Sequence, residues 1–100
     1  MEWNSVRQEI LEIFKDKSEK LGINPDLEIE FIEDAPVLGE YVYGEAFPDI
    51  NKVWLQIVAP DASDDKIMEI VCHELIHIKY TELDHNKPKF QKMVEQCKIM

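Results

Sequence analysis

The segment His73-Glu74-Leu75-Ile76-His77 contains two histidines and a glutamate at a spacing that suits metal binding and metal-assisted catalysis. Four residues turn an α-helix by roughly 400°, so the imidazoles of His73 and His77 leave one face and can bind one ion. Glu74 projects beside them and can reach a water on that ion. This H-E-x-x-H pattern is typical of zinc peptidases. We therefore predict a Zn²⁺ site with Glu74 as the general base; two hydrogen-bonded core histidines are the alternative.

A third ligand is required, because a catalytic zinc ion has three protein ligands. The remaining histidine, His85, follows His77 after seven residues, which lets the helix end and the chain turn back towards the ion. We predict His85 as this ligand, with a solvated loop histidine as the alternative. Three acidic residues are fallback ligands: Glu82, Asp84 and Glu95. Asp84 is also a candidate outer-shell partner of an imidazole.

Two further requirements of peptide hydrolysis have candidate residues. A hydrogen-bond donor must steady the oxyanion, and Tyr41, Tyr43 and Tyr80 are candidates, with ordinary packing as the alternative. An exposed strand edge beside the metal must hold an extended substrate through its backbone. The segment Glu45-Ala46-Phe47 is the candidate edge, with an ordinary hairpin strand as the alternative.

The elements that must position these residues follow from hydrophobic periodicity. Spacing of three and four residues predicts helices, and alternation predicts strands. The predicted order is helix 5–21, strands 27–32, 39–47 and 52–59, helix 64–80 and a last helix with the apolar stripe Phe90, Met93, Val94 and Cys97, which Ile99 can extend. The middle helix is apolar on nearly all sides, which predicts burial. The fold class is therefore α+β, with an N-terminal support helix, a small three-stranded, mainly antiparallel sheet, a buried active-site helix and a C-terminal helix.

Turn and cap signals bound these elements. Gly22 is expected to end the first helix. A turn at 48–51 joins two strands closely enough to favour antiparallel pairing. Asn86 is the expected cap of the last helix, with Pro88 in its first turn.

Composition limits the partners and the location. One hundred residues, 45% of them hydrophobic, predict one globular domain over residues 1–100. A net charge of −10 disfavours nucleic acid, whose phosphates it repels. No apolar run reaches the length of about eighteen residues that spans a membrane, and the first residues lack a secretory signal. We therefore expect a cytoplasmic protein that binds neither membranes nor nucleic acid.

The two cysteines, Cys72 and Cys97, each lie on an apolar helical stripe and have no C-x-x-C spacing. In a reducing cytosol we expect two buried free thiols, with a disulfide between them as the alternative. Cys72 is a poor fourth zinc ligand, because it points about 100° around the helix from His73.

The H-E-x-x-H segment at 73–77, His85 and the following helix with Phe90 resemble a minigluzincin, a minimal soluble zinc peptidase of about this length. Minigluzincins are similar to this chain in using a histidine as third ligand, whereas classical gluzincins use glutamate. The 45–47 segment is similar to the Asn-Ala-Phe rim strand of membrane-embedded gluzincins. The region from His85 to Phe90 is also similar to SprT-like metallopeptidases. A metzincin has a glycine where this chain has Tyr80.

This resemblance implies a zincin-like fold, zinc-dependent endopeptidase activity on peptide or protein substrates, and zymogen-like latency through a C-terminal segment that covers the cleft. If the last helix packs on a neighbouring molecule, a homodimer by exchange of that helix results.

Two other function classes remain open. A non-catalytic zinc-binding module would not need Glu74, and a structural site usually has a fourth protein ligand. A metal-dependent endoribonuclease family carries H-x-x-x-H-x-x-x-x-x-H, which is similar in outline. Glu74 and the charge of −10 disfavour the nuclease.

Overall fold

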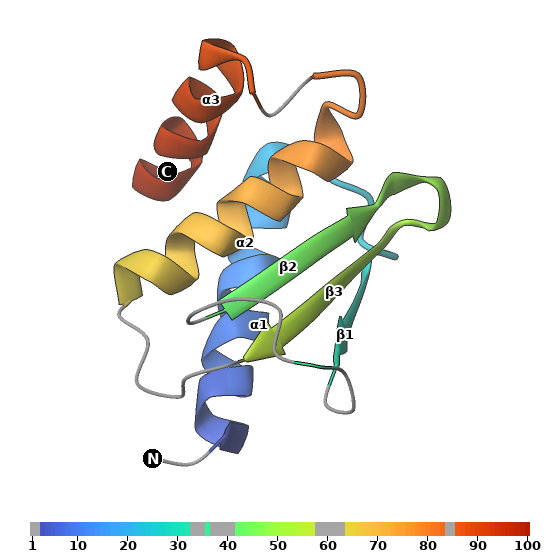
Figure 1. Ribbon diagram of the computed structural model, residues 1–100, viewed down its shortest axis with the longest axis vertical. Coiled ribbons are helices and arrows are strands. Elements are labelled where there is room, and N and C mark those ends of the chain that lie inside the picture. The colour runs from blue at the N-terminus through green and yellow to red at the C-terminus, as the bar shows by residue number, and fades with distance from the viewer. Residues whose placement is uncertain (1–2, 33–35, 37–41, 58–63, 84–85) are drawn as a thin grey trace.

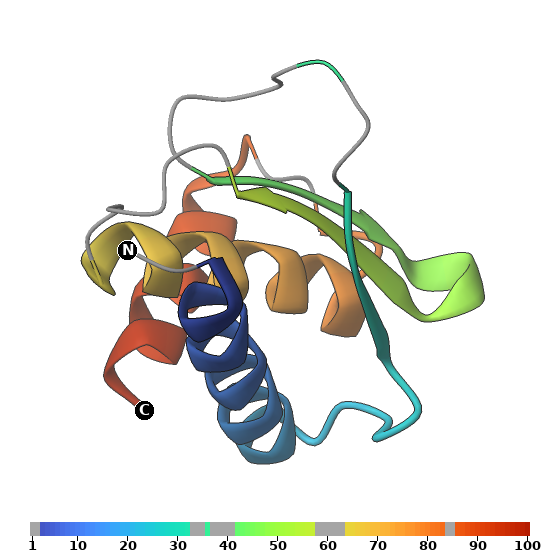
Figure 2. The ribbon, with the colours of Figure 1, turned by 90° about the horizontal axis from the view of Figure 1, so that it is seen from below.

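The computed structural model describes residues 3–32, 36, 42–57, 64–83 and 86–100. Figure 1 shows α2 lying between α3 on one side and strand β2 on the other, and Figure 2 shows α1 and α2 on the same face of the sheet. The predicted α+β class is thus confirmed. In chain order the elements are α1 (Trp3–Leu21), β1 (Glu28–Phe31), β2 (Val42–Phe47), the 3-10 turn η1 (Pro48–Ile50), β3 (Lys52–Ile57), α2 (Asp64–Lys79) and α3 (Pro88–Ile99).

The three strands form a mixed sheet in the order β1-β3-β2. As predicted from the short turn between them, β2 and β3 pair antiparallel, with Gly44 opposite Leu55. β1 pairs parallel with β3, with Ile29 beside Val53. The expectation of a mainly antiparallel sheet was therefore wrong, because β1 lies beside β3 and not beside β2, the next strand along the chain. Among the described strands, this order also puts β2 at an edge.

Chain turns occur where the sequence indicates them. Gly22 has φ +71° after the end of α1, and the Ile23 N–H donates to the Ser18 carbonyl at 2.9 Å, which closes the helix end. The link from β2 to β3 runs through η1 and ends at Asn51 in the left-handed region. α3 has Pro88 in its first turn as expected, but its N-cap is Lys87 and not Asn86, and the Lys87 side chain makes no capping hydrogen bond.

α2 is buried because two apolar sides of it meet different neighbours. Ile67, Val71 and Leu75, four residues apart, join the core formed with α1 and the sheet. Cys72 and Ile76 join a second cluster with α3. The first cluster also contains Val6, Ile10, Phe14, Val53 and Leu55, and the second Phe90, Val94 and Cys97. Among the described helices, none combines the length and apolar composition of a transmembrane segment.

Candidate metal centre

His73 and His77 lie one turn apart on α2, as their spacing predicts, and both side chains are half-buried. Their Nε2 atoms are 3.1 Å apart, and the ring centroids are 4.7 Å apart. At this separation one nitrogen can donate a hydrogen bond to the other, or both can contact one cation. Helix geometry alone brings these two groups together.

Phe90 lies against both imidazoles from α3. Its ring centroid is 4.9 Å from that of His73 and 4.6 Å from that of His77. Only 1% of Phe90 is exposed, so its ring is held within the α2–α3 interface. The apolar spacing of α3 predicted a buried Phe90, but its contact with both histidines depends on how α3 packs on α2.

Glu74 is buried, with 3% of its surface exposed, although a glutamate usually lies at the surface. Desolvation raises its pKa to about 7, and the nearby negative charge of Glu45 adds to the rise. A carboxyl group with a pKa near neutral can accept and return a proton under ordinary conditions. This environment suits a general acid and base.

Gly44 on β2 makes room for the Glu74 side chain. A Cβ at position 44 would lie 2.9 Å from Glu74 Cγ and from Glu74 Oε2, closer than real Cβ contacts. Gly44 pairs with the fully buried Leu55, so the two positions share the sheet face that the helices cover. The sequence showed only a glycine within a strand pattern, and its role appears only when β2 packs on α2.

A cavity of about 390 Å³ opens beside these groups. It lies between β2 and the C-terminal half of α2, so the expected strand edge at 45–47 adjoins the histidine pair. Its described lining residues are Gly44, Glu45, Ala46, Pro48, His73, Glu74, His77 and Thr81. Thr81 was not singled out in the sequence, because a hydroxyl residue after a helix carries no distinctive signal.

The predicted third ligand, His85, lies outside the described residues, as do Asp84 and Tyr41. Among the residues that the structure does describe, no group of three His, Cys, Asp or Glu side chains could hold a metal ion. Neither fallback acid, Glu82 or Glu95, therefore completes the site. Glu95 instead accepts a hydrogen bond from Gln91 at 3.0 Å.

The two described tyrosine candidates do not line the cavity. Tyr43 pairs with Gln56, one residue along from the inward-facing Gly44, so it projects from the sheet face opposite to the helices. Tyr80 lines a neighbouring hollow of about 400 Å³. Thr81 is the described hydroxyl residue at the cavity.

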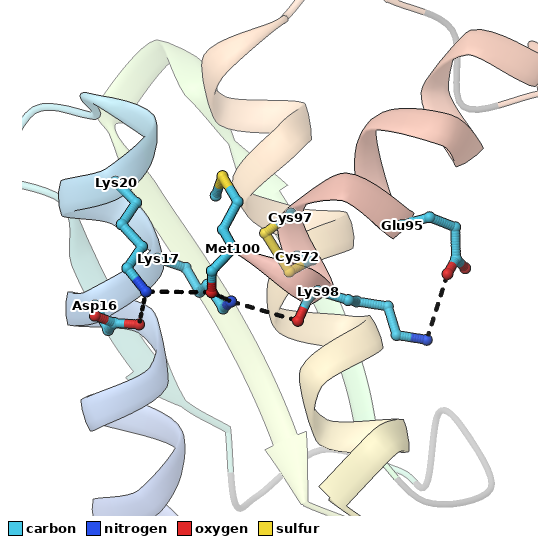
Figure 3. The surroundings of a disulfide bond; sticks show 8 residues. All are labelled: Asp16, Lys17, Lys20, Cys72, Glu95, Cys97, Lys98 and Met100. Carbon is cyan, nitrogen blue, oxygen red and sulfur yellow. Dashed lines mark hydrogen bonds and ion pairs between the residues drawn. A yellow bond between two sulfur atoms is a disulfide. The ribbon is translucent and has the colours of Figure 1, made fainter.

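Cys72 and Cys97 form a disulfide, with their Cα atoms 5.8 Å apart. The expectation of two free thiols was wrong, because the apolar stripes of α2 and α3 pack face to face and bring the sulfurs together (Figure 3). Cys72 is thereby directed towards α3, in agreement with its exclusion as a zinc ligand.

The histidine pair fits a zinc ion by its donor atoms and their separation. Two imidazole nitrogens that each lie 2.0–2.1 Å from zinc, at a tetrahedral angle, are about 3.3 Å apart. The observed Nε2–Nε2 distance of 3.1 Å is close to this value. His73 and His77 could therefore supply two of the ligands.

No protein-family model matches the chain, and no curated protein or solved structure shows significant similarity to it. The case for a function consequently depends on the residues and geometry described above.

Proposed function

We propose that this protein is a zinc-dependent endopeptidase of zincin-like, minigluzincin type. His73 and His77 would hold the ion together with His85. When bound, zinc supplies a Lewis acid that polarises the scissile carbonyl and lowers the pKa of water to about 7. The observation that carries the proposal is that the convergent Nε2 atoms, the buried Glu74 carboxyl and an edge strand adjoin one cavity.

Glu74 acts as the general base in this proposal. Its carboxylate takes a proton from the attacking water and then delivers it to the leaving amine. Its pKa of about 7 keeps the deprotonated form accessible near neutral pH and makes the protonated form an effective acid.

β2 would bind the substrate backbone. An edge strand has backbone N–H and C=O groups on its outer side, and an extended peptide can pair with them as an additional strand. Glu45 and Ala46 line the cavity, so a peptide paired there would pass the histidine pair. This arrangement favours an extended peptide or a locally unfolded protein segment as the substrate.

Latency and an exchanged dimer stay predictions. Within the described part of the chain, no α3 residue lines the cavity, and α3 packs on α2 of its own chain through the Cys72–Cys97 disulfide. Cleavage by the untreated protein would contradict latency. A molar mass equal to one chain at all concentrations, measured by light scattering, would contradict the dimer.

The decisive experiment compares bound zinc and peptide cleavage in the wild type and in Glu74→Ala. We expect Glu74→Ala to retain zinc and to lose cleavage, because it removes the proton carrier but leaves the imidazoles. Glu82→Ala, which removes an exposed acid from the following loop, is the matched control and should keep both properties. A wild type that cleaves the peptide, together with a Glu74→Ala variant that cleaves it at the same rate, would exclude this mechanism. A wild type that binds no zinc would exclude the metal site.

A further inference from the structure

In the described part of the chain, the ring of Phe90 contacts the rings of both candidate ligands, and Phe90 comes from a different helix. Its centroid distances of 4.9 Å to His73 and 4.6 Å to His77 are within the range of packed aromatic pairs. The His73 and Phe90 rings meet edge to face, at 68°, whereas the His77 ring is tilted by 42°. A fixed ring in this position restricts the rotation of both imidazoles about their side-chain bonds.

α3, which carries Phe90, is bonded covalently to α2 next to the histidine pair. Cys72 directly precedes His73, and Cys97 lies two helical turns beyond Phe90 on the same apolar stripe. Phe90, Cys97 and Cys72 are all at most 1% exposed. Phe90 and Cys97 lie on the same face of α3. The disulfide therefore holds this face against α2.

Weaker contacts hold the far end of α3. Lys98 forms an ion pair with Asp65 at 3.1 Å. Lys17 and Lys20 of α1 donate to the backbone oxygen of Met100 at 2.7 Å and 3.2 Å (Figure 3). Asp65 and Lys20 are largely exposed, so the contacts that these two residues make add little in water. Without the covalent bond, the packing of α3 depends on one small apolar cluster and on the buried Lys17 contact.

We propose that Phe90 is a positioning residue for the imidazoles of His73 and His77, and that the Cys72–Cys97 disulfide sets its position. The order of the metal site then depends on the thiol–disulfide state of the protein. The dependence on metal rests on the proposed function, whereas the restriction of the imidazoles by Phe90 does not.

The redox step is an ordinary thiol–disulfide exchange with a dithiol. One thiolate of the dithiol attacks a sulfur of the Cys72–Cys97 bond, that bond breaks, and the second thiol of the reductant displaces the mixed disulfide. Two electrons and two protons pass to the protein, which gains two thiols, and the dithiol becomes a disulfide. Because both sulfurs are buried, α3 must first separate locally from α2.

Nuclear magnetic resonance of the imidazole protons in metal-free protein provides the first test. In the oxidised wild type, we expect ring-current shifts on the His73 and His77 signals from Phe90. Phe90→Leu should abolish them, and reduction with dithiothreitol should diminish them. Val94→Ala, which removes apolar volume one turn further along α3, is the control for loosened packing and should leave the shifts in place.

Zinc titration against a chromophoric chelator, with zinc alone as the probe, provides the second test. We expect Phe90→Leu and the reduced wild type each to bind zinc about tenfold more weakly than the oxidised wild type, as on loss of an outer-shell support. Val94→Ala should bind like the wild type. When Co²⁺ replaces zinc, its visible spectrum should differ from that of the oxidised wild type in Phe90→Leu and in the reduced wild type, but not in Val94→Ala.

The outcomes separate the inference from the proposed function. If Phe90→Leu leaves the imidazole shifts unchanged, Phe90 does not position the histidines. If reduction changes neither the shifts nor the zinc affinity, the disulfide does not set the position of Phe90. If the oxidised wild type binds no zinc, the metal site is wrong, and the imidazole signals still decide the positioning role.

Discussion

Gly44 on β2 and Glu74 on α2 are in such close contact that Glu74 occupies the space of a missing side chain. A Cβ at position 44 would lie 2.9 Å from Glu74 Cγ and Oε2. The backbone of β2 thus sets the position of the buried carboxyl group, which lies between the proposed substrate-binding strand and the helix of the histidine pair.

Gly44→Ala should therefore reduce peptide cleavage at least about tenfold, because a displacement near 1 Å can cost about a hundredfold in rate. Zinc affinity should stay within about twofold, since neither imidazole touches position 44 in the described contacts. Stability should change by less than about 1 kcal/mol, because alanine favours the strand relative to glycine and Glu74 can shift. Steady-state kinetics and a zinc titration check this, with Tyr43→Phe on the opposite sheet face as control. Full activity in Gly44→Ala would show that the contact has no catalytic role.

The raised pKa of Glu74 predicts a pH-dependent stability in metal-free protein. Burial moves this pKa from 4.5 to about 7, so between these values the folded state binds more protons than the unfolded state. The contribution of Glu74 to the free energy of unfolding is therefore greatest below pH 4.5. This contribution is lost as the pH rises to about 7. The full difference is about 3 kcal/mol.

Glu74→Gln should remove this loss, because its side chain is similar in shape and does not ionise. Denaturant unfolding at several pH values between 4.5 and 8 measures the difference from the wild type. Glu82→Gln, at an exposed position, serves as control and should reproduce the wild-type profile. Parallel profiles for Glu74→Gln and the wild type would contradict the assigned shift.

His85→Ala tests the third ligand, which the described residues leave open. Loss of a direct ligand should weaken zinc binding by more than the 10–100-fold expected for an outer-shell partner. Asp84→Ala should produce the smaller, outer-shell effect if Asp84 supports an imidazole. Glu82→Ala should have none. Chelator competition measures all three, and a His85→Ala protein with wild-type affinity would remove His85 from the site.

The disulfide should stabilise the fold by roughly 3.5 kcal/mol in the chain-entropy model, given the sequence separation of 25 between Cys72 and Cys97. Unfolding by urea with and without dithiothreitol measures this difference. The double variant Cys72→Ala/Cys97→Ala cannot form the bond and should not respond to the reductant. Equal stability of the oxidised and reduced wild type would contradict the expected contribution.

Two lysines on α1 offer a matched comparison at the end of α3. Lys17 is 3% exposed and donates to the Met100 oxygen at 2.7 Å, while the more exposed Lys20 donates to the same oxygen at 3.2 Å. Lys17→Met should lower the free energy of unfolding by about 1–2 kcal/mol, because it removes the shorter and part-buried of the two charge-assisted hydrogen bonds to this oxygen. Lys20→Met should cost less than about 0.5 kcal/mol. Thermal unfolding measures both, and equal effects would contradict this ranking.

Local pattern predicted most element positions. The structure's α2 runs from Asp64 to Lys79, where the sequence indicated 64–80, and the turn at Gly22 ends α1 as expected. The strand alternation of β1 also holds, with Ile29 and Phe31 less exposed than the glutamates beside them. Its partner was not predictable, because alternation reports which side chains share a face but not which strand lies alongside. That limitation produced the error in sheet type.

The candidate site divides in the same way. Spacing on one helix is enough to predict that His73 and His77 converge, and the structure has their Nε2 atoms 3.1 Å apart. Three other features of the site form only when a second element packs on α2. They are the contact of Glu74 with Gly44, the contact of the Phe90 ring with His77, and the cavity that Thr81 lines. No periodicity within a single segment encodes those contacts.

By itself, then, the sequence determined the three helices, the β2–β3 hairpin and the convergence of two imidazoles, because hydrogen bonding and side-chain direction within one element follow from local residue order. Only the tertiary structure decided that β1 pairs with β3, that Cys72 bonds to Cys97 and that Glu74 is buried against Gly44. These contacts join segments far apart in the chain, and their formation depends on how whole apolar faces fit together.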